Sequence, residues 1–81
     1  MLSIKVLGPG CARCVEVAQL AQKAVNTLSV DARVEKVTEI SEIAKFRILA
    51  TPGLVINDKV VSAGRIPTLA EVTTWVTNAL S

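Results

Sequence analysis

The chain contains no histidine and no tyrosine, and its aromatic residues are one tryptophan and one phenylalanine. Without imidazole, metal sites and nucleophile–base pairs that depend on histidine are excluded within one chain. Nucleic-acid surfaces need clustered cations, and single-strand binders also need stacking rings. The nine Lys and Arg residues are scattered, with no run of five or more, so we expect no nucleic-acid partner.

Long apolar runs are also missing. No run approaches the roughly 18 residues that a membrane-spanning helix requires, and "MLSIKVLG" is too short for a signal-peptide core followed by a cleavage site. We therefore expect no membrane partner and a cytoplasmic location, where thiols are kept reduced. The 81 residues are 51% hydrophobic and 20% charged, with a net charge of +2. This composition predicts one globular domain over residues 1–81, which we expect to be a monomer.

Hydrophobic periodicity predicts the first elements. Residues 2–8 and 32–37 alternate apolar and polar side chains, as strands do. Residues 14–28 instead place apolar side chains at helical spacing. The sequence thus predicts a strand, a helix and a second strand.

A second, shorter helix is expected after Thr38, whose hydroxyl can cap it. Ile40, Ile43 and Ala44 would share its buried face, and Phe46 would extend the apolar surface at its end.

The second half of the chain begins with a hairpin signal. Residues 53–58 and 59–64 meet at Asn57-Asp58, a pair suited to a tight turn between antiparallel strands. Thr68-x-x-Glu71 then has the pattern of a capping box that opens a last helix, and helical apolar spacing follows to Leu80.

The predicted order is β-α-β-α-β-β-α, an α/β fold with a four-stranded mixed sheet and helices on both faces. Strands one and two would be parallel with a right-handed crossover, and the hairpin would extend the sheet in antiparallel fashion. Sites in such sheets form where strand ends meet helix N-termini. Cys11 and Cys14, the two cysteines of the chain, lie at such a point.

The stretch "GPGCARCVEVA" (8–18) admits several kinds of cysteine chemistry. Two buried cysteines can simply pack, although a glycine-flanked turn is a poor packing site. A permanent disulfide would close a very short loop and add little stability. Two thiolates are half of the four ligands that structural zinc needs, so a metal site requires a dimer or a two-coordinate ion such as Cu(I).

The position of the cysteine pair at a helix N-terminus favours another interpretation, reversible dithiol–disulfide exchange. A helix N-terminus stabilises a thiolate, and Arg13 adds a cation beside the pair. Thiols in such surroundings ionise at pKa values of roughly 3.5–7.5, below the ordinary value of about 8.5. Cys11 precedes the helix body and is the expected nucleophile, whereas Cys14 would lie beneath it against the sheet as the resolving thiol.

The stretches "KVLGPGCARC", "VEKVTEISEI" and "ATPGLVINDKVVSAGR", with the closing helix, resemble the small thioredoxin-like redox-active disulfide proteins of archaea and bacteria. The resemblance implies a thioredoxin-like fold and a thiol–disulfide oxidoreductase. It implies a cis bond at Thr51–Pro52, with Pro52 facing the dithiol and the backbone of Thr51 pairing with an extended substrate segment. A trans proline that begins a strand is the alternative at this position.

The resemblance also implies partners. They are disulfide-containing client proteins and a flavin-dependent thioredoxin reductase as electron donor. No cofactor beyond the redox-active Cys11–Cys14 pair and no metal are expected. The rival is a heavy-metal chaperone domain that binds copper or zinc through Cys-x-x-Cys, but such domains have the order βαββαβ and end in a strand.

Two cations near the predicted site need separate consideration, and the first is a departure from the thioredoxin pattern. Lys5 stands where thioredoxins have a buried acid that relays the proton of the resolving thiol. Its ammonium is expected in solvent. Because the acid is missing, proton transfer to and from Cys14 must use water or another group, for which Glu35 and Glu16 are candidates. Arg65 would attract acidic partners or be a solvated loop cation.

Overall fold

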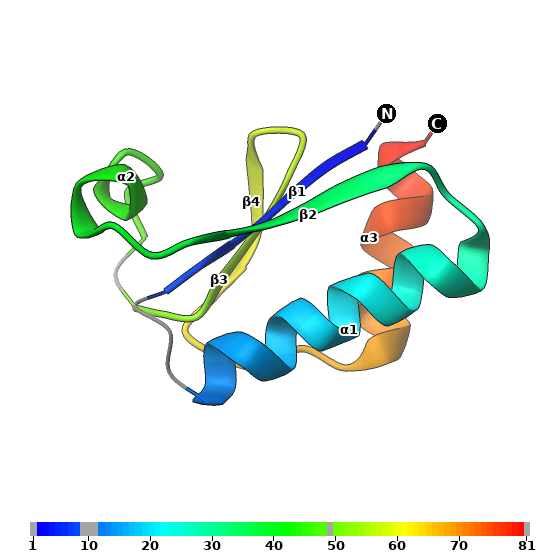
Figure 1. Ribbon diagram of the computed structural model, residues 1–81, viewed down its shortest axis with the longest axis horizontal. Helices are drawn as coiled ribbons and strands as arrows, with labels where there is room; N and C mark the ends of the chain where they lie inside the picture. Colours follow the sequence, from blue (N-terminus) through cyan, green and yellow to red (C-terminus); the bar gives the residue numbers. More distant parts are fainter. Residues whose placement is uncertain (1, 9–11, 49, 81) are drawn as a thin grey trace.

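The computed structural model describes residues 2–8, 12–48 and 50–80 (Figure 1). The elements are β1 (Leu2–Leu7), α1 (Ala12–Leu28), β2 (Ala32–Val37), α2 (Ile40–Ala44), β3 (Gly53–Ile56), β4 (Lys59–Ala63) and α3 (Leu69–Ala79). The predicted order of elements is confirmed. Helix α1 begins two residues earlier than the apolar spacing predicts, because Ala12 and Arg13 are exposed and contribute nothing to that spacing.

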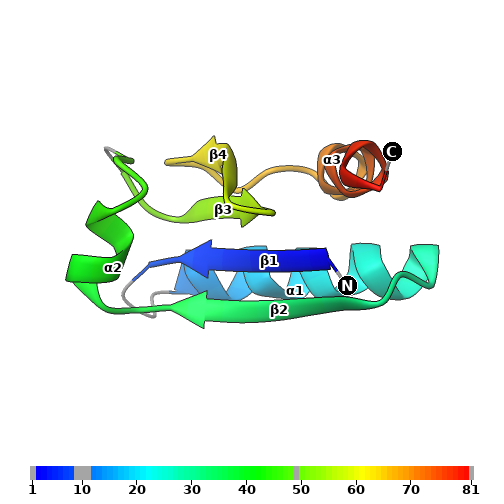
Figure 2. The ribbon, with the colours of Figure 1, turned by 90° about the horizontal axis from the view of Figure 1, so that it is seen from above.

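The four strands form one mixed sheet in the order β2-β1-β3-β4. Strand β1 pairs with β2 in parallel and with β3 in antiparallel fashion, and β4 is antiparallel to β3. The carboxyl ends of β1 and β2 and the start of β3 therefore lie at the same end of the sheet, beside α2 (Figure 2). This arrangement confirms the α/β, thioredoxin-like fold that the sequence predicts.

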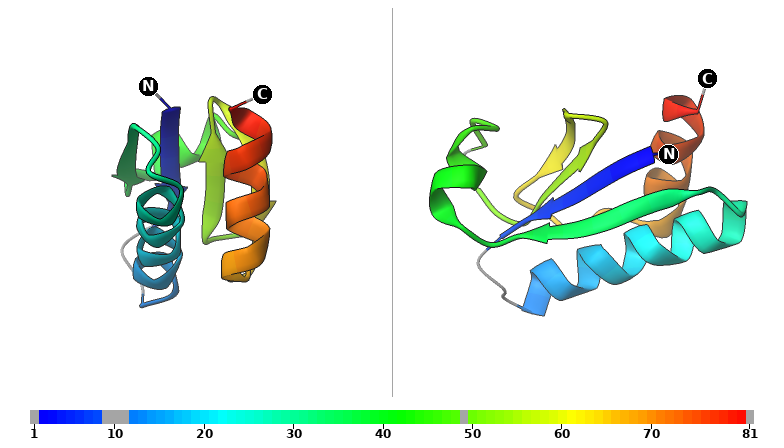
Figure 3. Two further views of the ribbon diagram at one scale, coloured as in Figure 1. Left: turned by 90° about the vertical axis from the view of Figure 1, so that its right-hand side faces the viewer. Right: turned by 45° about the horizontal axis from the view of Figure 1, so that its top comes forward.

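Helices cover both faces of the sheet, but unequally. Helices α1 and α3 pack against each other and against one face, which carries Ile4, Val6 and Leu54 (Figure 3). The opposite face carries a much smaller cluster, made by Leu7 and Val55 with α2. The larger cluster contains the fully or nearly buried residues Leu2, Ile4, Val6, Val17, Ala18, Ala21, Ala24, Val25, Leu54, Ile56, Val72 and Val76.

Helix α2 differs from its prediction in two respects. Its N-cap is Glu39 rather than Thr38, and no side chain caps it. Ile43 is buried, but Ile40 is 77% exposed and Ala44 is exposed as well. A helix of five residues makes little more than one turn, so one residue suffices to anchor it. Phe46 extends the apolar surface as expected, because it packs against the cluster that contains Ile43.

The hairpin between β3 and β4 turns at Asn57 and Asp58, as predicted. Both residues have positive φ, 50° and 66°, as a type I′ turn requires. Asn57 is anchored twice to Ser3 of β1. Its N–H donates to the Ser3 carbonyl at 2.8 Å, and its Oδ1 accepts from the Ser3 N–H at 3.1 Å. The turn is therefore held against the first strand.

The predicted capping box at the start of α3 is present. The Thr68 hydroxyl accepts from the Glu71 N–H at 3.1 Å, and the Glu71 carboxylate accepts from the Thr68 N–H at 3.0 Å. In the part of the chain that the structure describes, no helix is both long enough and apolar enough to cross a membrane.

Candidate active site

The candidate site lies at the end of the sheet where β1 stops and β3 starts. Leu7, the last residue of β1, pairs with Gly53, the first residue of β3. The chain leaves β1 through Gly8, whose N–H continues the ladder by donating to the Val37 carbonyl at 2.9 Å. Helix α1 begins four residues later at Ala12. Three parts of the chain therefore meet here: residue 8, the first turn of α1 and the segment before β3.

Cys14 lies in the first turn of α1 and is 5% exposed. Its sulfur packs directly on the backbone of Gly8. A Cβ built on Gly8 would overlap the Cys14 Sγ and would lie 3.2 Å from the Cys14 Cβ. The prediction that Cys14 is buried against the sheet is confirmed, whereas its position relative to Cys11 stays a prediction. Cys11 falls outside the described residues, so its predicted exposure stays a prediction.

The Thr51–Pro52 segment borders the same glycine. The peptide bond between Thr51 and Pro52 is cis. A Cβ at Gly8 would lie 3.8 Å from the Cβ of Thr51, so Thr51 and Cys14 both border the space that the missing side chain of Gly8 leaves. Pro52 is buried, and its carbonyl accepts from the Gly64 N–H at 2.9 Å. The end of β4 therefore holds the proline segment in place.

Cys14 lies at a helix start that contains no acidic residue. The first turn of α1 contains no Asp or Glu, and Arg13 is exposed beside Cys14. The unpaired N–H groups of a helix start carry partial positive charge and favour a thiolate over a thiol. Arg13 adds a formal cation to this field.

Lys5 is not simply solvated. Its side chain is 29% exposed, and its ammonium lies 5.6 Å from the centre of the Phe46 ring. The Nζ is also 3.8 Å from an Asp58 carboxylate oxygen. Side chains alternate between the faces of a strand, so Lys5 shares the α2 face with Leu7, whereas Ile4 and Val6 contact α1. The Lys5 side chain therefore has two partners, Phe46 and Asp58, which the sequence did not indicate.

Neither acid that sequence reasoning considered for the proton relay is well placed. Glu35 pairs in register with Lys5, so it lies on the α2 face of the sheet, opposite to the face that α1 covers. Its carboxylate instead binds Arg33 at 3.2 Å. Glu16 is exposed on α1, and residues two apart on a helix do not face each other.

Arg65 is not a free cation, because it forms an ion pair within the chain. Its guanidinium binds the Glu71 carboxylate in a bidentate pair at 3.0 and 2.7 Å. The Arg65 hydrogen bond, together with that of the Thr68 N–H, lowers the pKa of Glu71 to about 2. The same pair raises the pKa of Arg65. The loop after β4 is thereby tied to the cap of α3.

Sequence reasoning missed three residues that shape the site. Gly8 was assigned only as a strand end, although its missing side chain makes room for Cys14. Gly64, with a φ of 79°, supplies the N–H that holds Pro52. Glu71 was assigned only to the capping box, although it also binds Arg65. For Gly8, the sequence did contain a signal, because this glycine directly follows a strand and stands three residues before Cys11.

The described residues offer no additional group of ligands for a metal ion. Residues 2–8, 12–48 and 50–80 contain no group of three or more Cys, Asp or Glu side chains that could hold an ion. The order of elements also differs from βαββαβ, because the hairpin follows α2 and the last element is the helix α3.

A buried thiol at a helix start, packed on a strand end that a cis Thr-Pro segment also borders, is an arrangement suited to thiol–disulfide chemistry. Comparison with known proteins agrees. The thioredoxin domain family model matches residues 2–77. The thioredoxin of Methanocaldococcus jannaschii is 38% identical over 72 residues, which cover 89% of this chain and 83% of the relative. The thioredoxin of Methanothermobacter thermautotrophicus is 33% identical over 72 residues, covering 89% and 94%.

The chain therefore belongs to the thioredoxin family, a family of thiol–disulfide oxidoreductases.

Proposed function

We propose that the chain is a protein disulfide reductase that uses Cys11 and Cys14. The observation that carries this proposal is the position of Cys14, which is buried in the first turn of α1, on the backbone of Gly8 and near Thr51. A thiol in this position is shielded from large reagents and stands three residues after Cys11 in the sequence. Such shielding suits a resolving thiol better than a nucleophile that must reach a client.

The reaction consists of two exchange steps. The Cys11 thiolate attacks one sulfur of a client disulfide, forming a mixed disulfide and releasing the other client sulfur as a thiolate. The Cys14 thiolate then attacks the Cys11 sulfur, which releases the second client thiolate. The client gains two electrons, and the chain is left with a Cys11–Cys14 disulfide. A thioredoxin reductase, as the family suggests, would return two electrons to that disulfide.

Arg13 and the helix start act on the thiolates. Both place positive charge near the pair and so favour the reactive, ionised form. Water is the proposed proton carrier for Cys14, since Glu35 lies on the α2 face and Glu16 points away from Cys14 on the helix.

The client segment is proposed to lie against Thr51 and Pro52. Thr51 is exposed at the site, and Pro52 is held from below by the Gly64 N–H. The backbone of Thr51 can therefore pair with an extended segment and present a client disulfide to Cys11. The small residues Ala12, Ala50 and Gly64 are exposed around it and leave room for a protein surface. We propose the cytoplasm as the location, because its reducing pool keeps such a dithiol supplied with electrons.

Reduction of a protein disulfide by dithiothreitol tests the proposal. Wild-type protein should accelerate the reaction, and both Cys11→Ser and Cys14→Ser should abolish the acceleration. Only Cys14→Ser should accumulate a mixed disulfide with the client, because Cys11 can then attack but no second thiol can release it. An inert wild-type protein, or mixed disulfides that accumulate in Cys11→Ser instead, would contradict the assignment.

A second experiment isolates the role of Arg13. Arg13→Gln should slow alkylation of the reduced protein by iodoacetamide near neutral pH, because it removes a cation beside the thiolates. Lys23→Gln is the matched control, since Lys23 is an exposed cation on the same helix that lies far from its first turn. Equal rates in the two variants would remove Arg13 from the proposal.

A further inference from the structure

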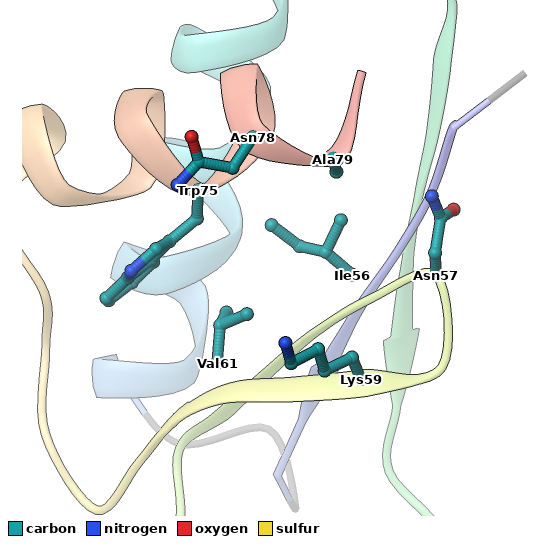
Figure 4. A pocket seen from close by; sticks show the side chains of 7 residues that line it. All are labelled: Ile56, Asn57, Lys59, Val61, Trp75, Asn78 and Ala79. Carbon is teal, nitrogen blue, oxygen red and sulfur yellow. The ribbon is translucent and has the colours of Figure 1, made fainter. Parts of the chain in front are cut away.

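A depression of about 310 Å³ lies at the end of the sheet opposite to the cysteine site. Strand β3 runs from Gly53 at the cysteine site to Ile56 at this depression, a separation of roughly 10 Å along the strand. The depression is lined by Ile56, Asn57, Lys59, Val61, Trp75, Asn78 and Ala79 (Figure 4). The hairpin and the last two turns of α3 form its walls, so it shares no lining residue with the cysteine site.

The walls of the depression are apolar and include one flat ring. Trp75 is half-buried, and part of its indole remains on the wall of the depression. Ile56 and Val61 face it from the hairpin (Figure 4). Large aromatic side chains contribute much of the binding energy when they contact a flat apolar ligand.

The polar groups at the rim are donors. Lys59 is the only charged residue among the lining residues, and its ammonium points towards the space between Val61 and Ile56 (Figure 4). The Oδ1 of Asn57 already accepts from the Ser3 N–H at 3.1 Å, which leaves the amide NH2 to donate. Asn78 brings a second amide from α3.

The nearest acid in sequence does not neutralise Lys59. Asp58 is 3.8 Å from Lys5, which lies on the α2 face of the sheet, whereas Lys59 pairs in register with Ile56 and shares its face. Among the described residues, no carboxylate lies within ion-pair distance of Lys59. The depression thus combines a flat apolar wall with unneutralised positive charge.

We propose that this depression binds a small organic carboxylate with a flat apolar body. The ring would lie against Trp75, and the carboxylate would pair with the Lys59 ammonium. The volume is at the lower end of the range of about 300–1,000 Å³ for ligand pockets, so the ligand is small. A free aromatic acid and the C-terminal carboxylate of a peptide that ends in an aromatic residue share this chemistry.

Binding can be measured through Trp75, the single tryptophan of the chain. Its indole N–H signal should shift in 15N–1H spectra on titration with 3-phenylpropionate, together with the side-chain amides of Asn57 and Asn78. The uncharged 3-phenylpropionamide should bind several-fold more weakly. The N-acetylated dipeptide glycyl-phenylalanine tests the peptide source, and tighter binding of the dipeptide than of the free acid would assign the site to peptide C-termini.

Lys59→Gln should weaken 3-phenylpropionate roughly two- to fivefold, the range expected for an exposed charge pair. Lys36→Gln is the matched control, because Lys36 is exposed on β2 and does not line the depression. The same 15N–1H spectra also show whether each variant is folded. Equal binding of acid and amide, equal affinity of Lys59→Gln and wild type, or no shift up to the solubility limit of the probe would each overturn the proposal.

Discussion

The contact between Cys14 and Gly8 yields the sharpest prediction, the effect of Gly8→Ala. The new methyl group would overlap the Cys14 Sγ and lie 3.2 Å from its Cβ. Gly8 cannot retreat without losing its hydrogen bond to the Val37 carbonyl at 2.9 Å, so Cys14 and the first turn of α1 must move. Overpacking of this kind lowers the free energy of unfolding by about 1–3 kcal/mol.

Gly53→Ala provides a matched control. Gly53 is also a buried glycine at a strand end, but its new methyl group would meet the Ile48 Cδ1 at 2.8 Å, the far end of a flexible side chain. Loss of chain entropy in the unfolded state stabilises such a variant by about 0.4–1 kcal/mol and offsets part of the clash. Gly53→Ala should therefore stay within about 1 kcal/mol of wild type.

Two measurements separate the variants. Urea unfolding gives the change in stability of each. Alkylation of Cys14 by iodoacetamide, in a Cys11→Ser background, reports the position of the buried thiol. Gly8→Ala should accelerate alkylation because the displaced sulfur becomes more exposed, and Gly53→Ala should not. Gly8→Ala with wild-type stability and an unchanged alkylation rate would refute the packing argument.

Three further predictions concern the start of α3 and the hairpin turn. Glu71→Gln should destabilise the protein at neutral pH, and urea unfolding should show its difference from wild type vanishing as pH falls. The Glu71 pKa is lowered to about 2 from 4.5, so the stabilisation is complete above 4.5 and lost towards 2; a constant difference would contradict this. Thr68→Ala should cost about 1 kcal/mol in thermal unfolding through the lost cap, and Thr68→Ser should restore most of it. Asp58→Gly should raise the free energy of unfolding, because glycine is favoured at a φ of 66° and the exposed Lys5 pair adds little; lower stability in urea would contradict it.

Local patterns were sufficient to predict the order of the elements. Alternation in residues 2–8 and 32–37 and helical spacing in residues 14–28 reflect burial on one face, which the packed sheet shows. The Asn57-Asp58 turn and the capping box also depend on neighbours in sequence, so both were predictable. These signals operate within a few residues of the chain.

Features that depend on distances between elements were not predictable in the same way. The burial of Ile43 and the exposure of Ile40 depend on how a five-residue helix meets the sheet. The close approach of Cys14 to Gly8 depends on how near α1 passes to the end of β1. The Arg65–Glu71 pair requires a loop that folds back on the helix that follows it.

The unequal cover of the two sheet faces has a consequence for amide hydrogen exchange. Strands β1 and β3 have a neighbour on each side and contact the large α1/α3 core, so their amides should open only on global unfolding. Helix α2 has one buried residue and rests on a small cluster, so its amides should exchange through local opening. Since α2 stands at the same end of the sheet as the start of α1, one flank of the site could rearrange around the proposed client while the strands beneath Cys14 remain closed.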